Sequence, residues 1–194
     1  VLLPDMITLP APGKTARCLA QAVAAYEKHG GNIIAVEEVA PDQTHQYGIV
    51  SVGEEFGETF EITGMVEKPP KGTAPSNFII SGRYILQPEI FSILERGERG
   101  AGGEIQLTDG MKRLAETQKF YGMHYRGKTY DTGSKVGFLA ANVAFAMARP
   151  DATPIDLMRI TRERLAARSH GAVPGPASFD ELVFLTGARP VTLR

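Results

Sequence analysis

The apolar run IIAV at residues 33–36 constrains the fold more than any other segment. Its apolar residues are continuous and do not alternate with polar ones, so the pattern predicts a strand that is covered on both faces. Residues 15–29 before it have helical composition, and two glycines at 30–31 supply a stop signal for that helix. A helix followed by a doubly covered strand predicts an α/β protein.

The middle of the chain has a different pattern, in which extended segments follow one another. Three extended segments, 47–52, 59–68 and 78–86, are separated by connections rich in Gly, Glu and Pro. Their spacing predicts an antiparallel insertion or edge, and the sheet as a whole is therefore predicted to be mixed. The remaining pattern predicts helices over 88–95, 104–117 and 135–148, a strand over 120–125 and a turn over 128–133.

Composition limits the class of protein. The chain has 194 residues, a net charge of -1 and 43% hydrophobic residues, which is typical of a globular domain without nucleic-acid or membrane partners. Its one cysteine, Cys18, excludes an intrachain disulfide and is expected to face the interior from a helix. No signal peptide and no apolar run of about 20 residues occurs, so we expect a cytoplasmic protein.

The chain is expected to comprise a domain over residues 1–151 and a helical tail over 152–194, where arginine, alanine and proline become frequent. The role of that tail stays open. Because the sequence opens on Val1 inside an apolar segment, we interpret it as a fragment of a longer protein.

Glu67 and Lys68 form the first candidate for chemistry, because two prolines follow them and end the strand there. A carboxylate accepts hydrogen bonds from sugar hydroxyls, and a lysine supplies three donors and a positive charge for a phosphate. The pair therefore suits a sugar phosphate. The same residues are also compatible with an exposed, charged strand end.

Two other carboxylates, Asp5 and Asp131, are predicted at strand or loop ends, and such a pair suits magnesium with waters and phosphate oxygens. The histidines are scattered and lack metal-ligand spacing. Asp131 begins an Asp-Thr-Gly triplet, but its flanking sequence does not fit an aspartic protease. Ser134 and Lys135 open a predicted helix, which indicates either a phosphate site or a plain N-cap.

Seven segments, in order and spacing, resemble the bacterial UTP:glucose-1-phosphate uridylyltransferase family. They are LPD at 3–5, THQYGIV at 44–50, VEKP at 66–69, APSN at 74–77, GRY at 82–84, GEIQLTD at 103–109 and YDTGSK at 130–135. The resemblance covers about residues 1–151. It implies a mixed-sheet, Rossmann-like nucleotidyltransferase fold, incomplete at the N-terminus, that uses Mg²⁺, glucose 1-phosphate and UTP and forms homo-oligomers.

The resemblance also implies roles for individual residues. The catalytic residues would be Asp5, Lys68 and Asp131, with Asp5 and Asp131 holding the metal. Substrate would be bound by Gly48, Glu67, Lys68, Asn77, Gly82, Arg83 and Lys135, of which Glu67 would bind glucose hydroxyls and Lys68 the sugar phosphate.

One part of the family pattern is absent from this sequence. Members carry a glycine-rich loop that binds UTP, and no such loop occurs here. We therefore expect the fragment alone to be weakly active or inactive. Two alternatives remain: another sugar-1-phosphate nucleotidyltransferase, and a non-catalytic module that binds a sugar phosphate.

Overall fold

The chain divides into two compact units, Val1–Thr129 and Tyr130–Arg194. A computed structural model describes residues 1–11, 13, 17–97, 105–149, 153, 156, 158 and 159. The tail predicted over 152–194 and the glycine-rich stretch at 100–104 therefore lie almost entirely outside the described residues.

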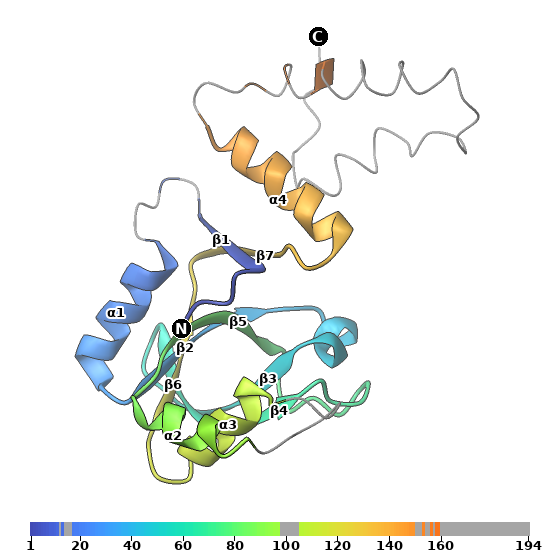
Figure 1. Ribbon diagram of the computed structural model, residues 1–194. Coiled ribbons are helices and arrows are strands. Elements are labelled where there is room, and N and C mark those ends of the chain that lie inside the picture. The colour runs from blue at the N-terminus through green and yellow to red at the C-terminus, as the bar shows by residue number, and fades with distance from the viewer. Residues whose placement is uncertain are drawn as a thin grey trace. The chain divides into compact units, whose positions relative to one another are not determined.

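The first unit is built on a closed five-stranded barrel (Figure 1). Its strand order is β2-β5-β3-β4-β6, and β6 pairs with β2 in parallel and with β4 in antiparallel orientation. The sheet is thus mixed, as predicted, and its closure leaves none of these strands with an unpaired edge. The strands are β2 (Asn32–Glu38), β3 (Gly48–Glu55), β4 (Thr59–Glu67), β5 (Phe78–Ile85) and β6 (Phe120–His124).

Strand β2 is buried on both faces, as its continuous apolar run predicts. Ile34 and Val36 belong to one core cluster, which also contains side chains of β3, β4, β5, α2 and α3. Ile33 and Ala35 point to the opposite face and join a second cluster that contains residues of α1. Because side chains alternate along a strand, two separate cores meet at this one element.

Helix α1 (Cys18–His29) covers the outer face of β2 and β5. It packs through small side chains, and Cys18 is buried there as predicted; burial raises the pKa of its thiol to about 11. Leu19, Val23 and Tyr26 fall on one face of this helix by periodicity and would be expected to pack there, but all three are exposed. The close approach to β2 and β5 is made by the small side chains.

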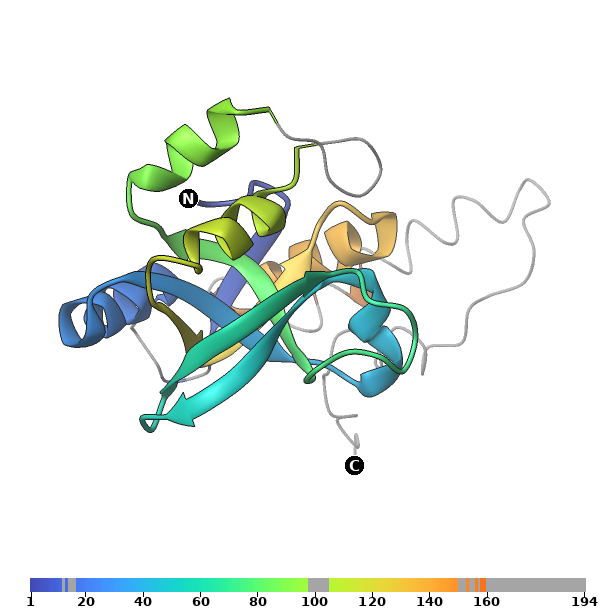
Figure 2. The same cartoon turned by 90° about the horizontal axis from the view of Figure 1, so that it is seen from below.

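Helices α2 (Glu89–Glu95) and α3 (Leu107–Leu114) pack against each other, and α3 also lies on β4 (Figure 2). Their core residues, which include Ile90, Met111 and Leu114, belong to the same cluster as Ile34. In this way α3 reaches the end of β4, where the predicted sugar-phosphate pair lies. Among the described residues no helix has the length and apolar character needed to cross a bilayer.

Three short elements were not predicted correctly. A 3-10 helix, η1 (Pro41–Gln46), precedes β3, and β1 (Met6–Pro10) pairs with β7 (Gly127–Asp131) in a separate two-stranded sheet. The turn expected over 128–133 was therefore wrong for residues 128–131. The two strands are five residues each and far apart in sequence, so local pattern carries little of their pairing.

The second unit begins with the end of β7 and continues into α4 (Lys135–Met147). Ser134 caps α4, since its hydroxyl oxygen accepts a hydrogen bond from the Gly137 N–H at 3.0 Å. The N-cap reading of Ser134 is confirmed. Tyr130 and Phe145 pack edge to face at 6.4 Å between ring centroids and fasten α4 to the strand end.

A tight contact inside the barrel gives the first prediction. Gly122 lies opposite Phe60, and a Cβ at Gly122 would come within 2.7 Å of three ring carbons of Phe60. Gly122→Ala is therefore expected to reduce the free energy of unfolding by about 1–3 kcal/mol through overpacking. Denaturant melts of both single variants and of the double variant with Phe60→Leu should show a less than additive loss, because the smaller side chain makes room. Additive losses would contradict the assigned contact.

Candidate functional site

The carboxylate of Glu67 is held at the point where β4 ends. The hydroxyl of Thr108, on the first turn of α3, donates a 2.7 Å hydrogen bond to Glu67 Oε2. Thr108 is buried and Glu67 is half-buried, so this bond fixes one oxygen of a carboxylate that remains partly open to solvent. A hydrogen bond to an ionised acceptor is among the stronger ones in proteins.

Gly48 lies directly opposite Glu67 on the neighbouring strand β3. A Cβ at this glycine would stand 2.9 Å from Glu67 Oε2 and 3.0 Å from Ile80 Cδ1, so any side chain would displace the carboxylate. The same hypothetical atom would lie 3.5 Å from the Thr108 hydroxyl. Gly48, Glu67 and Thr108 therefore converge on one point.

Lys68 follows Glu67 with an unusual backbone. Its φ is 43°, and it is the only non-glycine residue of the described segments with a positive φ. Its N–H donates to the Tyr47 carbonyl at 3.1 Å, which anchors the turn, while the side chain is exposed. A left-handed lysine costs about 1 kcal/mol or more, and such strain is often found at functional sites.

Asp5 and Glu67 both act electrostatically on one buried tyrosine. Burial raises the pKa of the Tyr84 phenol well above its usual range; Glu67 raises it further, Arg83 lowers it, and Asp5 adds a smaller rise. Tyr84 therefore lies within the fields of both carboxylates.

Gly82 and Arg83 are placed against the N-terminal segment. Gly82 has a φ of 71°, and a Cβ there would come within 2.9 Å of the Met6 side chain. Arg83 donates from its guanidinium to the carbonyls of Leu3 at 2.9 Å and of Met6. Both residues thus contact chain segment 3–6, and their expected part in a sugar pocket stays a prediction.

Asn77 lies just before β5 and is half-buried. Its carbonyl accepts a hydrogen bond from the Val39 N–H at 3.0 Å, and the neighbouring Ser76 hydroxyl donates to the Val50 carbonyl at 2.6 Å. These bonds tie the segment before β5 to the strands around it. They leave the expected role of the Asn77 side chain a prediction.

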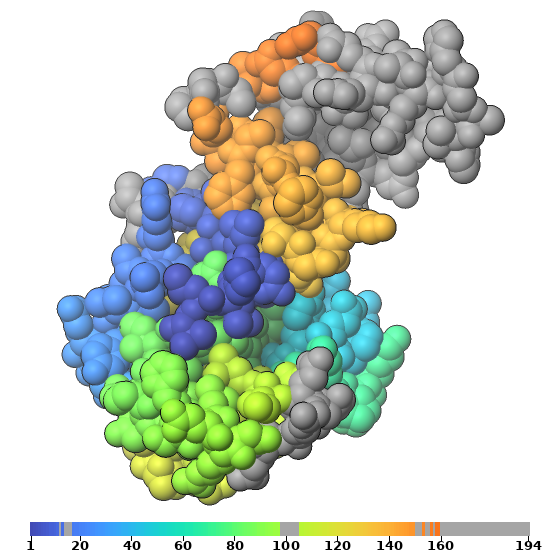
Figure 3. Space-filling view, viewed as in Figure 1, coloured from blue at the N-terminus to red at the C-terminus, as the bar shows by residue number. Residues whose placement is uncertain are grey.

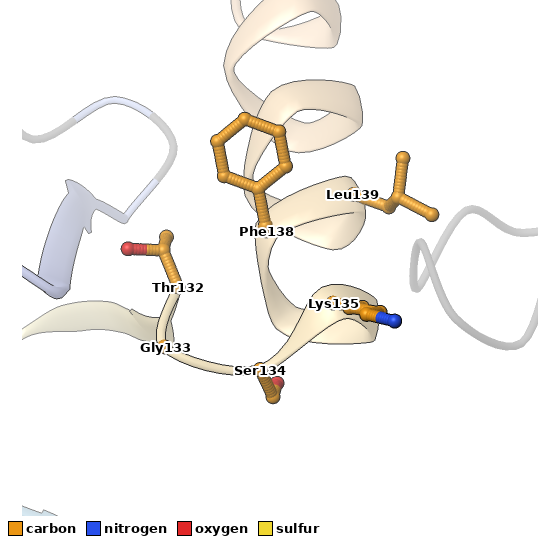
Figure 4. A pocket seen from close by; sticks show the side chains of 6 residues that line it. All are labelled: Thr132, Gly133, Ser134, Lys135, Phe138 and Leu139. Carbon is orange, nitrogen blue, oxygen red and sulfur yellow. The ribbon is translucent and has the colours of Figure 1, made fainter.

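Asp131 and Lys135 belong to the second unit. Asp131 Oδ1 accepts a hydrogen bond from the Gly133 N–H at 2.9 Å, which shapes the turn into α4. The start of α4 borders a cavity of about 360 Å³. Figure 4 shows the side chains of Lys135 and Thr132 pointing in opposite directions. The lining residues are Thr132, Gly133, Ser134, Lys135, Phe138 and Leu139.

The donors for a metal are carboxylates at the ends of elements. Within the described segments, no group of three or more His, Cys, Asp or Glu side chains gathers as a metal site. A magnesium ion held by one or two carboxylates and completed by phosphate oxygens and water needs no such group. Asp5 and Asp131 carry hard oxygen donors of this kind, and their role as metal ligands stays a prediction.

Comparison with known proteins decides the family, because residues 6–147 match the family described as Nucleotidyl transferase. The chain belongs to this nucleotidyl transferase family. It is also 45% identical over 143 residues to the UTP--glucose-1-phosphate uridylyltransferase of Bacillus subtilis (strain 168), a match that covers 74% of this chain and 47% of the relative. A relative with the same name from Komagataeibacter xylinus is 43% identical, over 70% of this chain and 46% of its own length.

Solved structures agree with the sequence matches. A UDP-glucose pyrophosphorylase complexed with UDP-glucose has a TM-score of 0.70 at 35% identity, covering 76% of this chain and 55% of that one. A UTP-bound UGPase from Acinetobacter baumannii has the same TM-score at 34% identity, covering 84% of this chain and 55% of that one. The predicted nucleotidyltransferase fold is confirmed, and this nucleotidyl transferase chain spans about half the length of its relatives.

Sequence reasoning did not assign Thr108 or Tyr84 to the site of this nucleotidyl transferase. Both lie inside segments that carry the family resemblance, GEIQLTD at 103–109 and GRY at 82–84. A polar residue in a matching segment that begins a helix was the available signal for Thr108. Its partner is 41 residues away in the chain, so only the fold reveals what the hydroxyl does.

The strained backbone of Lys68 gives a prediction about stability. Lys68→Gly should be more stable than Lys68→Ala by about 1 kcal/mol, because glycine adopts a positive φ without a Cβ clash. At the exposed neighbour Lys71, which has no positive φ, the order should reverse, since glycine there only adds freedom to the unfolded chain. Thermal or denaturant unfolding of the four variants measures both differences. If the alanine variant were the more stable one at position 68 as well, the backbone of Lys68 would be unstrained.

Proposed function

We propose that the complete protein transfers the uridylyl group of UTP to glucose 1-phosphate, giving UDP-glucose and pyrophosphate. This chain would supply the half of the site that holds glucose 1-phosphate. The observation that carries the proposal is the carboxylate of Glu67, held at 2.7 Å by Thr108, facing a glycine and followed at once by Lys68. The names of the relatives support the choice of nucleotide and sugar.

Each element of this arrangement suits one part of the sugar phosphate. Since Thr108 occupies one oxygen of Glu67, the carboxylate is oriented and its remaining acceptor positions suit sugar hydroxyls. The missing side chain at Gly48 allows a sugar ring to approach the strand backbone. Lys68 offers an exposed ammonium beside them, which suits the phosphate.

We also propose Asp5 and Asp131 as the ligands of Mg²⁺, and Lys135 as a residue that faces phosphates. When bound, the metal would offset negative charge on the reacting phosphates. Asn77 and Gly82 stay in the proposal as residues around the sugar pocket, whereas the bonds of Arg83 to the carbonyls of Leu3 and Met6 favour a different role for it. The assignment of the metal ligands rests on the donor chemistry of their side chains and on the family resemblance.

In the proposed reaction a phosphate oxygen of glucose 1-phosphate attacks the α-phosphorus of UTP. A new P–O bond forms as the bond to the β-phosphate oxygen breaks, and pyrophosphate leaves. The residues of this chain would hold the attacking phosphate in line and reduce its repulsion from the nucleotide, effects that together supply much of such catalysis. No side chain has to act as a strong base, because the attacking oxygen is already ionised at neutral pH.

The cellular compartment and the assembly state of the protein can also be proposed. A single cysteine, buried as a thiol in α1, fits a reducing compartment, and we propose that the protein is cytoplasmic. We propose in addition that it forms homo-oligomers. Subcellular fractionation and light scattering of the complete protein test these two points.

The activity is tested with the complete protein by following UDP-glucose or pyrophosphate release. Glu67→Gln should raise KM for glucose 1-phosphate about 10-fold or more, since hydrogen bonds to a charged group are worth roughly 1.5–3 kcal/mol. KM for UTP should stay within about 2-fold, because Glu67 is assigned to the sugar side only. A preference for another nucleoside triphosphate would favour a sister nucleotidyltransferase. Binding of glucose 1-phosphate without turnover would favour a binding module.

Thr108 provides a finer test of the same site. Thr108→Val keeps the branched shape and removes the donor, so KM for glucose 1-phosphate should rise about 5- to 20-fold. Thr108→Ser keeps the hydroxyl and should remain within about 3-fold of the wild-type value. Calorimetric titration of this chain with glucose 1-phosphate gives the same comparison without turnover. Equal values for the valine and serine variants would show that the hydroxyl does not orient Glu67.

A further inference from the structure

Arg83 directs its guanidinium to backbone carbonyls. Nη1 donates to the carbonyls of Leu3 at 2.9 Å and Gly82 at 3.0 Å, and Nη2 donates to the carbonyl of Met6. The side chain is half-buried on β5, so these bonds are partly shielded from water. Spreading several donors of one planar group over a bend of backbone is a geometry that arginine provides and lysine does not.

The two carbonyls of the N-terminal segment lie on either side of Asp5. Leu3 precedes Asp5 by two residues and Met6 follows it directly. The residues between them, Pro4 and Asp5, form a turn just before β1. The guanidinium bonds to the backbone on both sides of this turn and so limits its movement.

Other bonds hold the same segment onto β5. The Leu3 N–H donates to the Gly82 carbonyl at 3.0 Å, and the Val1 ammonium donates to the Tyr84 carbonyl at 2.9 Å. Gly82 has no Cβ, which leaves room for Met6 to pack against the strand. The segment, dark blue in Figure 3, lies at the surface of the first unit, where Asp5 is exposed and Met6 is buried.

We propose that Arg83 is a positioning residue for Asp5: its guanidinium fixes the backbone on both sides of Asp5 and thereby sets the place of a divalent cation. This inference rests on the proposed function, because it takes Asp5 as a metal ligand. It assigns Arg83 to the metal side of the site. The alternative role, a contact to the sugar, is the outcome that would overturn it.

The test uses the complete protein and a titration with Mg²⁺. Arg83→Gln should raise the Mg²⁺ concentration for half-maximal uridylyl transfer about 10-fold, with KM for glucose 1-phosphate changed less than about 3-fold and kcat partly recovered at high Mg²⁺. Arg83→Lys, which keeps the charge and loses the fork, should lie between Gln and wild type. Arg126→Gln is the matched control, since Arg126 pairs with Glu58 at the exposed surface.

A second readout is independent of turnover. Amide exchange of residues 3–6, followed by mass spectrometry, should be about 10-fold faster in Arg83→Gln and unchanged in Arg126→Gln. Binding of Mn²⁺, followed by electron paramagnetic resonance, should weaken in parallel. Circular dichroism melts identify a variant that fails to fold, in which case the lysine variant carries the comparison.

The outcomes separate the inference from the proposed function. If the wild-type protein makes no UDP-glucose while exchange at 3–6 and Mn²⁺ binding still depend on Arg83, the function fails and the positioning role stands. If UDP-glucose is made but Arg83→Gln raises KM for glucose 1-phosphate with an unchanged Mg²⁺ requirement, the inference is overturned. A lysine variant equal to wild type in every readout overturns it as well.

Discussion

The pairing of β6 with two strands at once is the constraint on which the first unit depends. β6 lies parallel to β2 and antiparallel to β4, so it joins the helix-covered side of the sheet to the antiparallel hairpin that carries the candidate site. Phe60 fills the space above Gly122 within this closure and is fully buried. The start of β4 is paired with β6 and its end with β3, so the strand is held by a different neighbour at each end. Glu67 takes its position from the pairing with Gly48 on β3 and from the hydrogen bond to Thr108.

The two charged groups of the site lie on different kinds of backbone, one on a paired strand and one on a strained turn. Glu67 ends a paired strand and is oriented by a helix, whereas Lys68, one residue later, has a left-handed backbone. A charged acceptor thus sits on the stiff part of the frame and a long cationic side chain on the turn beside it. Such a division is appropriate for a ligand with one end that is recognised by direction, the sugar, and one that is recognised by charge, the phosphate.

Much of this arrangement could be predicted where the signal was local. The unbroken apolar run of β2, the interior position of Cys18 and the cap at Ser134 all follow from neighbouring residues. The packing face of α1 could not be predicted in this way, because Leu19, Val23 and Tyr26 are more apolar than the small residues that contact the sheet. Pairing of β1 with β7, closure of the barrel and the bond from Thr108 to Glu67 each join distant segments. These long-range contacts depend on the path of the chain in space, and the hydrophobic periodicity of a segment carries no information about that path.

Three glycines, Gly48, Gly82 and Gly122, share one property: a neighbouring side chain occupies the space that their own Cβ would need. At each of them a Cβ would clash with that neighbour, so the local structure requires glycine. Chemical similarity is therefore a poor guide to tolerated variation in this chain. A change to alanine at these points alters no charge and removes no functional group, yet it acts directly on a carboxylate, on the segment that carries Asp5, or on the core. Natural variants at such positions should be judged by the volume of the neighbour, and only afterwards by the polarity of the substitution.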